Sequence, residues 1–154
     1  MSPRSAFLGC LALVVTSTFA GTPSDPILGE YAGNWSAHHR AFLDGRIDPS
    51  GSYSEVSGVA LQLQPDGFAM VVPYQGHWKQ RGAKYRINCS KYATEFTIAT
   101  SGDPHATGAV KAKSIERDAL GAIHGRIAMA FRFRFGGKHV KLTTKGPFAA
   151  AKTT

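Results

Sequence analysis

Four basic side chains fall on one face of the most regular segment of this sequence. Phenylalanines alternate there with arginines, and Gly136-Gly137 then forms a two-residue turn that fixes the register of the returning strand. In that register Arg132 lies opposite Lys141, and Arg134 lies opposite His139. Like charges placed directly opposite each other destabilise a strand pair by up to about 1 kcal/mol, and this hairpin contains no carboxylate to relieve them. The pattern predicts either a solvated outer face or an anion-binding surface formed by these four residues.

Apolar side chains occupy the opposite face of the same hairpin and recur by alternation in two earlier segments. If the sheet closes on itself, these side chains point inward, where they either fill a packed core or line a cavity for a small apolar molecule. The residues expected to line such a cavity are Phe68, Met70, Phe96, Ile98, Phe131 and Phe133.

The remaining titratable residues form no recognisable catalytic or metal-binding motif. The six histidines include the neighbours His38 and His39, which a strand would direct to opposite faces, and no zinc-binding spacing occurs. Most carboxylates lie in turn-like segments, as backbone geometry favours, and no nucleophile elbow or phosphate loop is present. We therefore predict no catalytic residue, no metal and no cofactor. A cofactor-free barrel cyclase or isomerase using Glu95 or His77 stays open as an alternative.

Short segments of alternating polarity, separated by turns about every ten residues, must position these side chains. No stretch shows a helical apolar period. Strands are expected at 31–40, 59–64, 68–74, 77–80, 84–89, 92–100, 109–115, 126–135 and 138–145. The pattern predicts an all-β fold, an antiparallel meander of about eight or nine strands. A closed up-and-down barrel is favoured because closure removes exposed edges, and a β-sandwich is the alternative.

The first twenty residues are typical of a cleavable secretory signal. Arg4 precedes an apolar run at 6–15, and Thr18-Phe19-Ala20 places small residues before a cut at Gly21. The run is too short for a membrane span, so no transmembrane segment is expected. We predict a secreted or periplasmic protein with a flexible leader at 21–29, one barrel domain at 30–148 and a flexible tail at 149–154.

The formal net charge of +8 suits an anionic partner, although it also favours solubility. Nucleic acid is not expected as that partner, because the aromatic and basic residues of the last hairpin face opposite ways. Cys89 is the only cysteine beyond the signal, so no internal disulfide is expected. It is predicted to be a small buried residue or, alternatively, a reactive or intermolecular thiol.

Gly33-Asn34-Trp35, on the first expected strand, resembles the Gly-x-Trp motif of lipocalins and related calycin barrels. The resemblance implies a barrel that binds small apolar ligands. It also implies that Trp35 plugs the closed end of the barrel beneath a basic side chain of the last strand, either Lys141 or Lys145.

Together these patterns predict an exported, non-enzymatic protein that holds a small apolar ligand in a β-barrel cavity. One alternative is a basic-surface protein that binds an anionic macromolecule, as an inhibitor or envelope factor would. The cyclase or isomerase above is another. The sequence does not indicate an oligomeric state.

Overall fold

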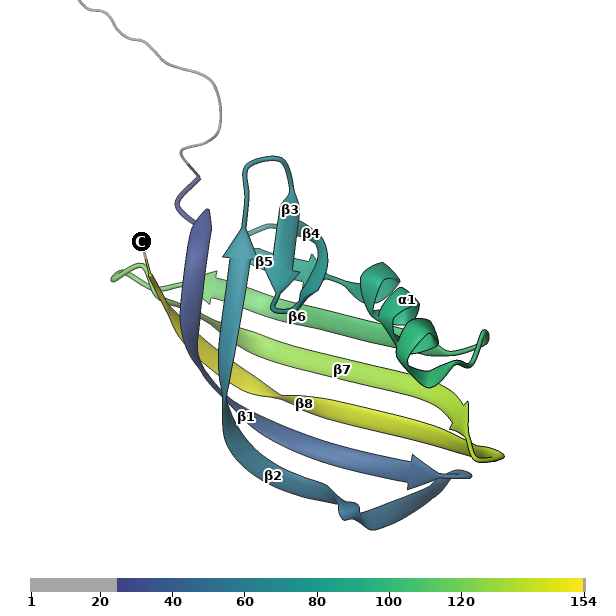
Figure 1. Ribbon diagram of the computed structural model, residues 1–154. Coiled ribbons are helices and arrows are strands. Elements are labelled where there is room, and N and C mark those ends of the chain that lie inside the picture. Colours follow the sequence, from purple (N-terminus) through teal and green to yellow (C-terminus); the bar gives the residue numbers. More distant parts are fainter. Residues whose placement is uncertain (1–24, 154) are drawn as a thin grey trace, which may run out of the picture.

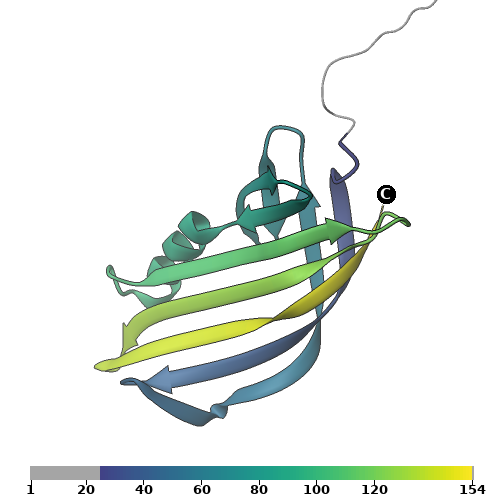
Figure 2. The same cartoon turned by 180° about the vertical axis from the view of Figure 1, so that it is seen from behind.

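The computed structural model describes residues 25–153 and shows a ring of antiparallel strands with one helix (Figures 1 and 2). Each strand pairs with the next in sequence, and the last pairs with the first, so the all-β meander is confirmed. The elements in chain order are β1 (Gly29–Leu43), β2 (Arg46–Leu63), β3 (Phe68–Val71), β4 (Tyr74–Arg81), β5 (Lys84–Asn88), α1 (Ser90–Ser101), β6 (Thr107–Arg117), β7 (Ile123–Phe135) and β8 (Lys138–Lys152).

The β7–β8 hairpin has the predicted register. Arg132 pairs with Lys141, Arg134 pairs with His139, and Phe133 pairs with Val140. Gly136 and Gly137 both have positive φ, at 58° and 77°, which glycine adopts without steric cost. The turn therefore sets which side chains face the interior and which face solvent.

The expected strand at 92–100 is wrong, because this segment belongs to helix α1. Only two small residues of the helix are fully buried, Ala93 and Thr97, spaced four apart on one face. Gly102, with φ 74°, ends the helix, and its N–H donates to the Ile98 carbonyl. The larger side chains of the segment produce an alternation that resembles a strand, whereas the packing depends on the small ones.

The ring is closed at one end and open at the other. β2 pairs with β3 only at Leu61–Leu63, and β5 pairs with β6 only through Tyr85, Ile87 and Asn88. The long strands β6, β7, β8, β1 and β2 therefore extend well past the short strands β3–β5, as Figure 1 shows. We call the end with β3–β5 the narrow end, and the end with the β1–β2 and β7–β8 turns the wide end.

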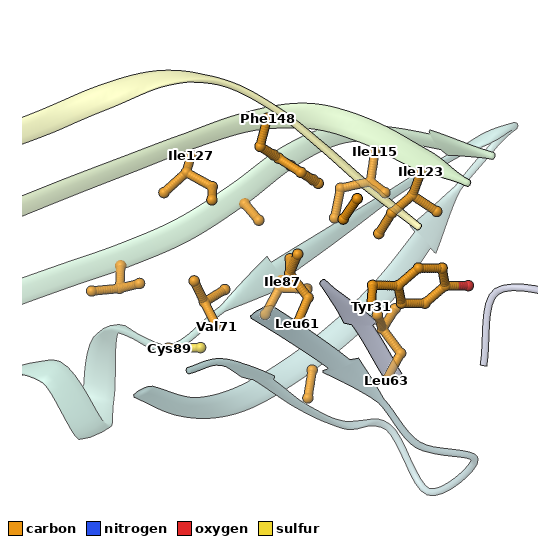
Figure 3. Packing of buried hydrophobic residues seen from close by; sticks show 14 of the residues in the cluster. Tyr31, Leu61, Leu63, Val71, Ile87, Cys89, Ile115, Ile123, Ile127 and Phe148 are labelled. Atoms are coloured by element: carbon orange, nitrogen blue, oxygen red, sulfur yellow. The ribbon is translucent and has the colours of Figure 1, made fainter. Parts of the chain in front are cut away.

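A packed core fills the narrow end. Its largest fully buried side chains come from all parts of the ring (Figure 3) and include Tyr31, Leu61, Leu63, Ile87, Ile115, Ile123 and Ile127. Cys89 is buried in the same cluster and is a free thiol. This core occupies the space that a ligand cavity at the narrow end would need.

Parts of both segments expected to be flexible belong to the fold where the structure describes them. Ile27, inside the expected leader, is fully buried, and its carbonyl accepts a hydrogen bond from the Tyr31 hydroxyl at 2.8 Å. The expected tail continues β8 as far as Lys152, which pairs with Tyr31 of β1. These segments are held because they cover the core and complete the ring. The expected secretory signal, residues 1–20, lies outside the described residues.

The backbones of β1 and β8 approach each other closely at glycines, which have no side chain. A Cβ at Gly146 of β8 would collide with the Ser36 carbonyl oxygen of β1, and one at Gly33 would collide with the backbone of Ala149. β1 and β8 can thus approach closely and curl the sheet. Within residues 25–153, α1 is too short and too polar to cross a bilayer.

Candidate functional site

A depression of about 510 Å³ lies at the wide end and brings all four predicted anion-binding residues together. Strand alternation places these basic side chains on the face opposite the inward-facing Phe131. We call this depression the rim pocket. The residues that line it are Phe42, Gly45, Asp103, His105, Arg132, Phe133, Arg134, His139, Val140 and Lys141.

The two acidic side chains near the rim pocket bond to backbone groups. The Asp103 carboxylate accepts the N–H of His105 at 2.9 Å and that of Arg134 at 2.7 Å, and these bonds hold its pKa below the ordinary value. Asp44, in the β1–β2 turn, accepts the N–H of His139 at 2.9 Å. Both carboxylates therefore fix the loops of the rim.

The cationic groups of the rim pocket form no salt bridge with any residue of the described chain. Lys141 places its ammonium 5.3 Å from the centre of the Phe42 ring, a cation–π contact. The Arg134 guanidinium lies 3.3 Å from Nε2 of His139. A guanidinium can only donate, so the His139 ring nitrogen is the acceptor in this contact. The pocket offers positive charge beside an aromatic surface.

The six expected cavity residues are not gathered in one place. Phe131 and Phe133 share the inner face of β7, and Phe131 packs against the core beside Tyr74. Phe96 and Ile98 lie on α1, and the Phe96 ring makes an edge contact with Tyr74 at 6.0 Å.

Phe68 and Met70 were expected to face inward, but they lie on the face of β3 opposite the buried Ala69 and Val71. The turn explains the difference. The Gln64 N–H bonds to the Phe68 carbonyl, so Gln64 and Phe68 lie opposite each other and the buried Leu63 pairs with Ala69.

His77 and Glu95, the residues of the cyclase or isomerase alternative, line one further depression of about 670 Å³ beside the start of α1. Glu95 reaches it from the helix rather than from a strand. Within residues 25–153, no three His, Cys, Asp or Glu side chains gather as a metal-binding group.

One polar cluster on the inner face was not predicted. His39 of β1 places Nε2 2.6 Å from Oε2 of Glu55 and Nδ1 2.9 Å from Oγ1 of Thr144, and its ring stacks on Tyr53. The alternation of β1 puts His39 on the same face as the buried Trp35 and would have indicated its direction. Its partner Glu55 was not recognisable, because the glycine- and serine-rich segment before it is typical of a loop and not of β2.

The features implied by the lipocalin resemblance are present only in part. Trp35 is buried and pairs with Phe148. Lys141 covers Phe42 instead, and Lys145 pairs with His38. A basic residue of the last strand does cover an aromatic ring at the narrow end, but it is Lys152 over Tyr31, at 5.7 Å.

Comparison of the chain with protein-family models, with curated proteins and with solved structures found no match.

Proposed function

We propose that this protein is an exported binding protein whose rim pocket takes a phosphate, sulfate or carboxylate group of an anionic macromolecule. The observation that carries the proposal is the convergence of Arg132, Arg134, His139 and Lys141 on one depression. These cations form no salt bridge within residues 25–153, and the carboxylates at the site bond to backbone N–H groups.

The chemistry of the pocket matches such a group. Arginine presents a planar fork of donors that fits carboxylate, sulfate and phosphate oxygens in pairs. Phe42 adds an apolar surface beside the charges, which suits the carbon skeleton that carries the anion. A volume of about 510 Å³ lies within the range of pockets that hold one small group or ligand. The signal-like residues 1–20 support a partner outside the cytosol.

The proposal is tested with heparin and dextran sulfate as polyanionic probes. The triple variant Arg132→Ala, Arg134→Ala, Lys141→Ala is compared with a control triple variant, Lys79→Ala, Lys111→Ala, Lys113→Ala. Both lose three cations, but the control cations do not line the rim pocket. We expect the rim variant to bind at least about tenfold more weakly and the control to change far less, with the difference shrinking as salt screens the charges. Equal losses would show that binding follows net charge alone, and the proposal would fail.

A second candidate function is the binding of a small apolar molecule on the inner face at the wide end. Leu43 and Leu142, on the adjacent strands β1 and β8, are 37% and 38% exposed, and Phe96 of α1 is 43% exposed. Exposed apolar surface of this kind can form a binding site. This candidate includes the lipocalin-like proposal, which is supported by Gly33-Asn34-Trp35 and by the barrel-like ring. Native mass spectrometry of protein purified from its own compartment tests it. A small mass released on denaturation supports this function, and a clean apo mass counts against it.

A further inference from the structure

The inner-face cluster around His39 joins a hydroxyl, an imidazole and a carboxylate in series. The three side chains come from three adjacent strands: Thr144 from β8, His39 from β1 and Glu55 from β2. His39 pairs directly with Thr144 across one strand boundary and stacks on Tyr53 at 4.5 Å between ring centres. The sheet therefore fixes both the position and the plane of the imidazole.

The direction of each proton follows from the partners. An ionised carboxylate can only accept, so Nε2 of His39 must donate to Glu55. In the neutral tautomer of the ring, Nδ1 is then an acceptor, and the Thr144 hydroxyl, 2.9 Å away, can donate to it. A hydroxyl that donates to an imidazole held by a carboxylate is the arrangement that activates an oxygen nucleophile.

We propose that Thr144, His39 and Glu55 form an acyl-transfer site that acts on small apolar esters. The substrate class follows from the surroundings of the hydroxyl. Thr144 pairs with Met129, and the next inward residue of β8, Leu142, pairs with Phe131. This apolar surface suits a short acyl chain. The side chains of His39 and Glu55 are 24% and 43% exposed, so a substrate reaches the cluster from the open wide end.

The reaction balances without any co-reactant except water. Oγ1 of Thr144 attacks the ester carbonyl carbon, and its proton moves to Nδ1 of His39. The carbon–oxygen bond to the alcohol breaks, the alcohol leaves with that proton, and the acyl group stays on Thr144. Water then attacks the acyl group, gives a proton to His39 and releases the acid, and the proton returns to Thr144. Glu55 holds the imidazole in the required tautomer throughout and is a positioning residue.

The test uses the purified protein with p-nitrophenyl butyrate and follows both nitrophenol release and the intact mass. Thr144→Val, His39→Gln and Glu55→Gln should each lower the rate by at least about 100-fold. Thr144→Ser should match or exceed the native rate, because it keeps the hydroxyl and removes a crowding methyl. A purely structural role of Thr144 does not predict that gain.

His38 provides the matched control. Its Nδ1 lies 2.6 Å from Oγ of Ser54, so it also joins an imidazole to a hydroxyl, but it lies on the outer face and lacks the carboxylate. His38→Gln should leave the rate unchanged. If a substituted protein fails to fold, labelling of the native protein with an alkyl fluorophosphonate replaces the rate comparison, and the adduct should map to Thr144. Rates equal in native and His39→Gln protein, or an adduct found only on other residues, would overturn the proposal.

Discussion

Thr94 and Gly108 exchange two hydrogen bonds. The Gly108 N–H donates to Oγ1 of Thr94 at 3.0 Å, and the Thr94 hydroxyl donates to the Gly108 carbonyl at 2.9 Å. Gly108 lies on β6 beyond Asn88–Lys111, the last pair between β5 and β6. The Thr94 side chain of α1 thus bonds to the Gly108 N–H and carbonyl groups, which a neighbouring strand would otherwise pair. The helix therefore lies beside β6 where β5 has ended.

Replacement of Thr94 by valine should destabilise the protein by about 1–3 kcal/mol, because it leaves both backbone groups of Gly108 without their partner. Urea denaturation measures the change. Thr100→Val is the matched control, since the Thr100 hydroxyl bonds only within its own helix, to Phe96 and Thr97, and Thr100 is exposed. Equal effects of the two substitutions would mean that the bonds to Gly108 do not hold the helix in place.

Gly146→Ala should destabilise the protein by about 1–3 kcal/mol or more, because the added methyl collides with the Ser36 backbone and forces β1 and β8 apart. Gly58→Ala, on β2 and with open space around the position, is its control and should change stability by less than about 0.5 kcal/mol. Thermal unfolding distinguishes the two. A mild Gly146→Ala effect would show that the curl of the sheet does not depend on that close approach.

The Cys89 thiol should react slowly with Ellman's reagent in the folded protein and quickly in urea. Burial raises its pKa, and this effect exceeds the smaller lowering by a hydrogen bond from the Val71 backbone. A raised pKa favours the neutral thiol in the folded state, so stability is full below the ordinary value of 9.0 and falls above it as the unfolded chain ionises.

The loss of stability at alkaline pH that is due to Cys89 is the part that is absent in Cys89→Ala. Burial also raises the pKa of the buried Tyr31 and of the partly buried Tyr74, and both tyrosines remain in both proteins. Comparison of the two unfolding curves between pH 7 and about 10 isolates the thiol. Parallel pH profiles would contradict the prediction.

Asp103 should titrate below its ordinary pKa of 3.8, because backbone N–H groups of His105 and Arg134 donate to its charged form. The stabilising effect is therefore full above the ordinary pKa of 3.8 and is lost as the pH falls from there through the lower pKa of the folded state. NMR titration of the carboxyl checks the direction. In Asp103→Ala, the amide protons of His105 and Arg134 should exchange faster with solvent, whereas unchanged exchange would mean that the carboxylate does not fix this loop.

The parts of the fold that follow local rules were predictable. Gly136-Gly137 determines the β7–β8 register, and this register alone placed Arg132, Arg134, His139 and Lys141 on one face. The same hairpin therefore yielded the basic residues of the rim pocket. Its lining by Asp103 and His105 was not predictable, since the loop after α1 meets β7 only through tertiary structure.

Two errors share one physical cause, which is that small residues occupy the buried positions. Ala93 and Thr97 are buried on α1, and Ala69 and Val71 are buried on β3, while larger neighbours are left more exposed. Size and hydropathy therefore predicted the wrong element in one case and the wrong face in the other. The cluster around His39 was missed for another reason: Glu55 and Thr144 reach it from strands 16 and 105 residues away in sequence.

The pairing of β1 with β8 has a consequence for how the chain assembles. Tyr31 pairs with Lys152, which lies near the other end of the described residues in sequence. The ring can therefore close only after the last strand has been synthesised. Until then β1 and β7 each present an open edge, and the triad of Thr144, His39 and Glu55 lacks its hydroxyl. Assembly of that site and closure of the sheet are therefore the same late event, and a chain truncated before β8 would have neither.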